Sequence, residues 1–188
     1  MAQDADGRAL IRRLLGADGE RLRMLRAVRT LRLPQAAIGA GFVRAAVWDH
    51  LHGFATPTPL DDIDVVYFDP DDPAATRDAD LEAALRRSLP GPNWDVKNQA
   101  RMHLRNGDAP YRDLGDAIAH WLETATCVAA RLNEAEDLEI VAPWGLDDLM
   151  NLRIRATPSG QRKGEDFRRR LGEKDWQGRW PRLTLDPA

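Results

Sequence analysis

The sequence predicts an α/β (α+β) fold in which helices pack on a mixed central sheet. Three observations support it: a helical pattern of apolar residues in 18–32, a continuous apolar run at 63–68, and an alternation of helical and extended segments elsewhere. A length of 188 residues, with 43% hydrophobic and 30% charged residues, is typical of one soluble domain. We expect a single domain over 1–188, with an N-terminal helical segment at about 8–33 and an Arg- and Trp-rich tail at about 160–188.

The first part of the chain predicts a helix, a strand, a glycine turn and a second helix. Apolar residues recur at helical spacing in 18–32, and this helix ends before Pro34. The short apolar run 36–38 predicts a strand, which ends in the turn 39–41. A helical pattern resumes at 42–52. This order is typical of helices that pack on a sheet.

Two central strands are predicted next. The run 63–68 is continuously apolar, as strands buried on both faces are. Turn-forming residues end it, and Asp72 is expected to cap the following helix with Pro73 at its first position. That helix covers 74–88. After a Pro- and Gly-rich break, the run 94–97 predicts the second central strand.

The remaining pattern predicts a helix at 113–122 and a hairpin whose strands are 124–132 and 138–142. A short helix at 145–149 and a strand at 152–155 follow. The tail is expected to form a solvated helix with its tryptophans packed against the core.

Composition excludes several classes of protein. The first residues lack the pattern of a signal peptide, and no apolar run approaches the ~18 residues of a membrane span, so we expect a cytoplasmic protein that does not associate with a membrane. The single cysteine, Cys127, excludes an intramolecular disulfide and is expected to be a buried, small hydrophobic residue. The net charge of -3 predicts no particular partner.

Two carboxylates at the head of the first central strand predict a metal site. Residues two apart in an extended chain point to the same side, so Asp62 and Asp64 can converge on one ion. Oxygen-only ligands suit Mg²⁺ or Mn²⁺, and Mg²⁺ at such sites also binds substrate phosphates, so a nucleoside triphosphate is the expected substrate. The alternative is a solvated Asp-rich turn.

Asp95 lies between Trp94 and Val96 on the second strand, where an unpaired charge is unfavourable. A metal on the neighbouring strand would explain it, and three carboxylates could hold two ions, with Asp95 favouring deprotonation of the acceptor. Alternatively, Asp95 pairs with Lys97 or Arg101.

The turn Gly39-Ala40-Gly41 is the candidate phosphate-binding element. Between a strand and a helix, its free amides and the helix N-terminus can face a phosphate, and Arg44 can add a bidentate contact. The alternatives are a turn that uses glycine only for its positive φ and an arginine that is solvated on the helix surface.

Four polar residues after Asp95 are candidate contacts to the nucleotide, because they lie where the strand ends: Lys97, Asn98, Gln99 and Arg101. Polar residues there can equally satisfy backbone groups of loops. Nucleic acid is a less favoured partner, since acidic residues are interleaved with Arg168, Arg169 and Arg170 in the tail.

Several segments together resemble a bacterial family of nucleotidyltransferase-like proteins, formerly a domain of unknown function, related to the DNA polymerase β superfamily. The resemblance covers roughly residues 20–184 and is carried by the segments 39–44, 61–69, 94–103 and 142–149. It implies a polymerase β-like nucleotidyltransferase fold and Mg²⁺-dependent transfer of a nucleoside monophosphate from a nucleoside triphosphate to an unknown acceptor.

The resemblance also assigns residues. Gly39 and Gly41 match the glycine turn, Asp62 and Asp64 the paired carboxylates, and Asp95 the third carboxylate. The chain departs from the superfamily in having no serine in the turn and about twenty residues between Gly41 and Asp62. These departures leave open an alternative, a catalytically inactive nucleotide-binding or regulatory module of the same fold.

Overall fold

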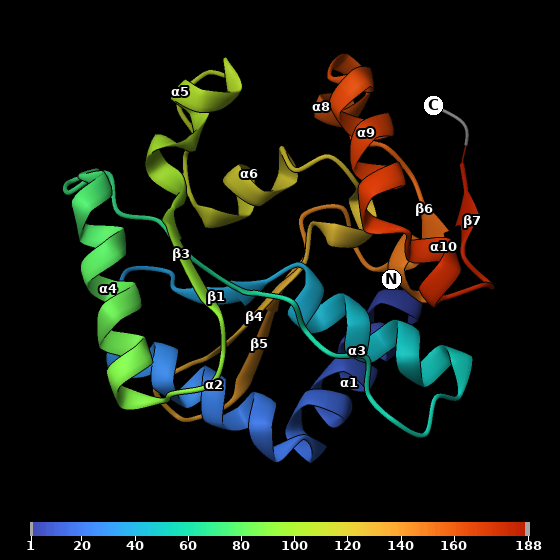
Figure 1. Ribbon diagram of the computed structural model, residues 1–188, viewed down its shortest axis with the longest axis horizontal. Helices are drawn as coiled ribbons and strands as arrows, with labels where there is room; N and C mark the ends of the chain where they lie inside the picture. Colours follow the sequence, from blue (N-terminus) through green and yellow to red (C-terminus); the bar gives the residue numbers. More distant parts are fainter. Residues whose placement is uncertain (1, 187–188) are drawn as a thin grey trace.

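Helices surround a central sheet in the computed structural model, which describes residues 2–186 (Figure 1). The strands are β1 (Ala37–Gly39), β2 (Ile63–Tyr67), β3 (Trp94–Asn98), β4 (Ala129–Leu132), β5 (Leu138–Val141), β6 (Arg153–Ile154) and β7 (Thr184–Leu185). The α-helices are α1 (Ala2–Ala17), α2 (Gly19–Thr30), α3 (Gly41–His52), α4 (Ala75–Ser88), α5 (Met102–Asn106), α6 (Leu114–Ala119), α7 (Asp147–Met150), α8 (Pro158–Arg162), α9 (Gly164–Lys174) and α10 (Trp176–Arg179). Two 3-10 helices are η1 (Gln99–Arg101) and η2 (Thr124–Thr126).

The main sheet is mixed, which confirms the predicted fold class. Its strand order is β3-β2-β1-β4-β5, with β2 parallel to β3 and the other neighbours antiparallel. Arginines of α1 cover the β5 edge, where Arg8 Nη1 donates to Ile140 O (2.7 Å) and Arg12 Nε donates to Leu138 O (2.9 Å). These donors occupy carbonyl groups that an edge strand would otherwise expose. The strand predicted at 152–155 is β6, which pairs with β7 in a separate two-stranded sheet.

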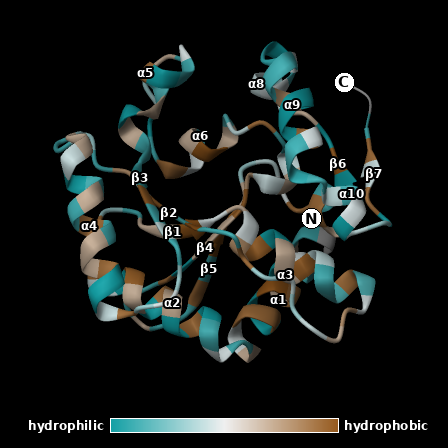
Figure 2. Ribbon diagram, in the orientation of Figure 1, coloured by the Kyte–Doolittle hydropathy of each residue, from teal (hydrophilic) through white to brown (hydrophobic). Residues whose placement is uncertain are grey.

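The two faces of the main sheet are covered differently. Helices α2, α3 and α4 supply the larger apolar cluster, which includes Ile63 and Val65 of β2. On the opposite face, α6 packs its Leu114 and Ile118 against Val66. Figure 2 shows hydrophobic residues concentrated in the central strands and α3, and hydrophilic residues over much of α9. Asp64 and Asp95 lie on the face that carries α6.

The N-terminal helical segment consists of two helices. Asp18 separates α1 from α2 in extended geometry (φ −95°, ψ 101°), and its Oδ1 accepts from Arg21 N at 3.0 Å. This is the N-cap arrangement that satisfies a free helix amide. The helix predicted at 18–32 corresponds to α2, whereas α1 was not predicted as a separate helix and only its second half fell within the helical segment expected at about 8–33.

The predicted cap at Asp72 and Pro73 was wrong, because α4 begins two residues later with Ala74 at its N-cap. Asp72 Oδ1 accepts instead from Ala74 N (3.4 Å), and Asp72 O accepts from Asn98 Nδ2 (3.1 Å). The asparagine at the end of β3 therefore holds this turn outside the helix.

The hairpin was confirmed in position, but its first strand begins at Ala129 rather than at Thr124. Residues 124–126 form η2 because Glu123 O accepts from Thr126 N (3.0 Å) and Cys127 N (3.2 Å). Cys127 itself is fully buried, as predicted.

The tryptophans of the tail pack against the core, as predicted. Trp176 and Trp180 are both buried, and their rings lie 5.8 and 5.1 Å from that of Trp48 on α3. Trp180 Nε1 also donates to the buried carboxylate of Asp49 (2.8 Å). These contacts attach the C-terminal helices to α3 (Figure 1). None of the described helices has the length and apolar character required to cross a membrane.

Candidate active site

Asp64 and Asp95 lie side by side on the two parallel strands. They are direct partners in the β2–β3 register. Because Ile63 and Val65 point into the larger apolar cluster, and Trp94 and Val96 do so from β3, the alternation of side chains directs both aspartates to the opposite face. Asp62 lies one residue before β2. The three predicted carboxylates are therefore brought to one region at the head of these strands.

The charges of these carboxylates repel one another. Burial, followed by the charges of Asp62 and Asp95, raises the pKa of Asp64 to about 6, although Arg170 and Arg44 act in the opposite direction. Within residues 2–186, no group of three His, Cys, Asp or Glu side chains is already arranged to hold a metal ion. The crowding and the oxygen-only donors nevertheless fit a hard divalent cation, which would relieve the repulsion at Asp64.

Asp95 has a counter-charge on its own strand. Lys97 Nζ pairs with Asp95 Oδ1 and lies 3.9 Å from Glu82 Oε1 on α4. The side chain of Asp95 is 42% exposed. The structure therefore shows the ion pair between Asp95 and Lys97 that the sequence offered as the alternative to a metal ligand.

The turn before α3 uses its residues differently from the sequence interpretation. The positive φ falls on Ala40 (φ 46°, ψ −113°), not on a glycine, so the proposal that glycine is needed for that geometry was wrong. A Cβ on Gly39 would approach Trp121 Cη2 to 2.7 Å, so Gly39 is required for packing. Strain of the kind seen at Ala40 is uncommon and clusters at functional sites.

The hydrogen bonds of the turn leave two amides for a ligand. Ala40 N donates to Val128 O (2.9 Å), whereas Ala40 O accepts from Val43 N (3.2 Å) and Arg44 N (3.0 Å). The N–H groups of Gly41 and Phe42, the first two of α3, lie ahead of the helical bonding pattern. They form the start of a twelve-residue helix, where an anion is stabilised.

Arg44 is buried, so the alternative of a solvated arginine was wrong. Its side chain lies 4.4 Å from the ring centroid of Trp176 and 5.1 Å from that of Trp48, measured from Cζ. Its Nε and Nη1 are buried without a hydrogen-bond partner among the described residues. Burial, followed by the positive charge of Arg170, lowers the pKa of Arg44 to about 10.

Two further charged residues at the site were missed by sequence reasoning. Glu123 is 1% exposed, and its Oε1 lies 3.1 Å from Arg170 Nε of α9. Thr126 Oγ1 donates to Glu123 Oε2 (2.9 Å). A glutamate beside the apolar stretch 125–130 is a signal that could have identified Glu123, because buried charges need partners. Arg170 carries no comparable signal among the many arginines of the tail.

Asn98 and Arg101 lie on the α4 side of the sheet, away from the aspartates. Asn98 is fully buried and its side-chain amide bonds to the backbone of Asp69, Asp72 and Ala100. Arg101 pairs with the buried Asp78 of α4. These contacts favour the alternative interpretation of both residues, as supports for loops.

Gln99 is also buried, and its Nε2 donates to Lys97 O at 3.4 Å. Of the four polar residues that follow Asp95, Lys97 is the one in contact with a candidate carboxylate.

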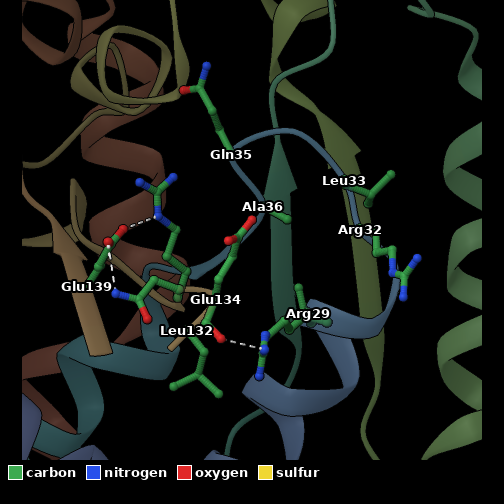
Figure 3. A pocket seen from close by; sticks show the side chains of 11 residues that line it. Arg29, Arg32, Leu33, Gln35, Ala36, Leu132, Glu134 and Glu139 are labelled. Atoms are coloured by element: carbon green, nitrogen blue, oxygen red, sulfur yellow. Dashed lines mark hydrogen bonds and ion pairs between the residues drawn. The ribbon is translucent and has the colours of Figure 1, made fainter. Parts of the chain in front are cut away.

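A hollow of about 770 Å³ lies elsewhere on the molecule, between α2 and the β4–β5 hairpin. Figure 3 shows Arg29 bonded to the backbone carbonyl of Glu134 at its lower rim, with the Gln35 side chain pointing away from them. Its lining comes from 28–36 and 131–139 and includes none of the candidate carboxylates. This hollow is separate from the candidate site.

The pKa of Asp64 gives a testable pH dependence for the metal-free protein. Carboxyl ¹³C chemical shifts of Asp64, recorded in EDTA, are expected to titrate near pH 6, well above the ordinary value of 3.8. Asp62→Asn should move this midpoint downward, because it removes a neighbouring negative charge. An Asp64 midpoint near 4 in the wild type would contradict the crowding of these carboxylates.

Comparisons with known proteins identify the family and support the fold. A family model described as nucleotidyltransferase matches residues 26–185. A solved structure described as a CCA-adding enzyme head domain is 32% identical, with a TM-score of 0.84 and coverage of 95% of each chain. No curated protein matches the chain.

Larger enzymes share the fold at lower identity. The Thermotoga maritima CCA-adding enzyme complexed with tRNA is 18% identical (TM-score 0.59), and a CCA-adding enzyme with CTP is 17% identical (TM-score 0.57). The matches cover 94% and 88% of the present chain. They cover only 42% and 39% of those enzymes, so the chain spans about two fifths of their length.

Proposed function

The chain belongs to the nucleotidyltransferase family, and from this premise we propose that it transfers a nucleoside monophosphate from a nucleoside triphosphate to an acceptor hydroxyl. Asp62, Asp64 and Asp95 would hold Mg²⁺ or Mn²⁺. The observation that carries the proposal is the register of β2 and β3, which places Asp64 beside Asp95, with Asp62 immediately before β2. Burial and the charges of Asp62 and Asp95 raise the pKa of Asp64 to about 6, in agreement with this crowding. A divalent ion is the ligand that such a cluster favours.

Each residue of the site has a role in this reaction. A bound metal would activate the attacking hydroxyl and neutralise charge on the triphosphate and its leaving group. Asp95 would accept the proton of the acceptor hydroxyl, because it lies beside Asp64 and its carboxylate is partly exposed. The amides of Gly41 and Phe42 and the side chain of Arg44 would bind phosphate oxygens.

The similar enzymes suggest which substrates to test first. Their descriptions name CTP, ATP and tRNA. We propose CTP and ATP as the first donors and an RNA 3′ end as the first acceptor. Two of the tail arginines have acidic partners, since Arg169 pairs with Asp166 and Arg170 with Glu123.

The proposal predicts that binding of Mg²⁺ and a nucleoside triphosphate depends on the paired aspartates. Calorimetry with Mg²⁺ and CTP or ATP should give a binding signal for the wild type that the Asp62→Asn/Asp64→Asn variant loses, because this variant removes the negative charge that holds the ion. Equal signals from the two proteins would refute the metal site.

The second candidate is a nucleotide-binding module without transfer activity, favoured by the pairing of Lys97 with Asp95 and by the absence of a serine in the turn. Labelled triphosphates distinguish the two candidates. Release of pyrophosphate with labelling of an acceptor excludes the inactive module. Binding without pyrophosphate release supports it.

A further inference from the structure

Two guanidinium groups from distant parts of the sequence meet on one tryptophan. Arg44 of α3 and Arg170 of α9 have their Cζ atoms 4.4 and 5.5 Å from the ring centroid of Trp176. Figure 1 shows α9 and α10 lying next to α3, which brings these residues together. The positive charge of Arg170 acts on Arg44, and both arginines act on Asp64. Two cations therefore contact the same tryptophan, and their charges act on the same carboxylate, Asp64.

Arg170 contacts its carboxylate partner through Nε alone. Its Nε lies 3.1 and 3.3 Å from the two carboxylate oxygens of Glu123, which is 99% buried. No partner for its terminal nitrogens is found among the described residues. Its side chain is 34% exposed, so those terminal nitrogens remain accessible. A guanidinium fixed in this way presents a fork of donors suited to phosphate oxygens.

Arg44 lacks the partners that a buried cation requires. It is 7% exposed, and its Nε and Nη1 make no hydrogen bond within residues 2–186. Buried unpaired donors are costly, and a second cation nearby raises the cost further. An anion with several oxygens that contacts both guanidiniums would satisfy the donors and relieve the repulsion.

We propose that Arg170 and Arg44 together bind the terminal phosphates of the nucleotide, with Glu123 as the positioning residue for Arg170. The identity of the anion rests on the proposed function, but the two-arginine site itself does not. Helix α9 then completes a site whose other parts come from β2, β3 and α3. Arg170 acts on the distal phosphates, whereas the aspartates act through the metal.

The test measures binding of inorganic tripolyphosphate by calorimetry in EDTA, using the full chain with Asp62→Asn and Asp64→Asn. This background removes both the metal site and its negative charge. Adding Arg170→Gln is expected to weaken binding at least ten-fold, equivalent to about 1.4 kcal/mol. Arg170→Lys should recover part of the loss, because it restores the charge but not the fork.

Arg169→Gln is the matched control. Arg169 lies on the same helix, is 64% exposed and pairs with Asp166. Its replacement should leave tripolyphosphate affinity within two-fold, and melting temperatures of all variants show that each is folded. Equal losses for the two glutamine variants would overturn the proposal, as would absence of binding in the background protein.

A second readout uses the otherwise unmodified chain with Mg²⁺ and the triphosphate. Arg170→Gln should raise the KM for the nucleotide more than it changes the KM for the acceptor, and Glu123→Gln should act in the same direction by freeing Arg170. If no transfer activity is found but tripolyphosphate binding depends on Arg170, the proposed function fails and the two-arginine site stands. If transfer occurs but Arg170→Gln does not change the affinity for tripolyphosphate, only this inference fails.

Discussion

Replacing Asp64 with Asn should reduce nucleotide transfer at least about 1000-fold while raising the thermal stability of the protein. Activity falls because a ligand of the proposed metal is lost, and a bound metal contributes several kcal/mol to such reactions. Stability rises because the folded state holds Asp64 at a pKa of about 6, above its ordinary 3.8. Ionised Asp64 therefore opposes folding above pH 6, and this penalty disappears as pH falls toward 4.

The expected gain is about 1–2 kcal/mol at pH 7.5, after allowance for solvent screening, or roughly 4 °C in melting temperature. Thermal unfolding in EDTA at pH 7.5 and pH 4.5 measures it, and the gain should be present only at the higher pH. Asp61→Asn is the control, because Asp61 is 60% exposed and pairs with Arg179 across the surface. A melting temperature of Asp64→Asn below that of the wild type at pH 7.5 would contradict the prediction.

Gly160→Ala is expected to destabilise the protein by about 3 kcal/mol. A Cβ at this position of α8 would overlap Leu122 O and lie 3.1 Å from the Leu122 carbonyl carbon. Backbone cannot rotate away as a side chain can, so α8 must shift, and overpacking of this kind is costly. Leu122 precedes Glu123, so the shift should also disturb the position of Arg170.

Gly172→Ala on α9 is the matched control, because a Cβ there meets nothing within 4 Å. It should stabilise the helix by about 0.5–1 kcal/mol, since alanine favours helix over glycine. Chemical unfolding of both variants measures the difference. A Gly160→Ala protein as stable as the wild type would show that α8 moves without cost.

Unfavourable features gather at the candidate site. Ala40 adopts a strained backbone, Asp64 is crowded by other carboxylates, and Arg44 is buried with unpaired donors. A ligand would relieve the last two of these features, a cation at the aspartates and an anion at Arg44. This distribution is expected where a protein is built to bind rather than to maximise its own stability.

Local sequence patterns were sufficient for the central strands β2 and β3 and for the side of the sheet on which Asp64 and Asp95 lie. In both strands apolar residues at every second position face the larger apolar cluster, so backbone alternation places Asp64 and Asp95 on the opposite side of the sheet. The glycine turn between β1 and α3 was likewise evident from local composition. These features depend on residues within a few positions of one another.

Tertiary structure decided the remaining parts of the site. Whether Asp95 pairs with Lys97, and whether Asn98 turns toward α4, depends on which elements pack beside β3. Glu123 and Arg170 are 47 residues apart, and their pairing arises only when α9 packs against the segment before β4. The sequence by itself determined which residues carry the charges, and packing between distant segments determined which charges meet, because electrostatic and hydrogen-bond partners are selected by distance in space.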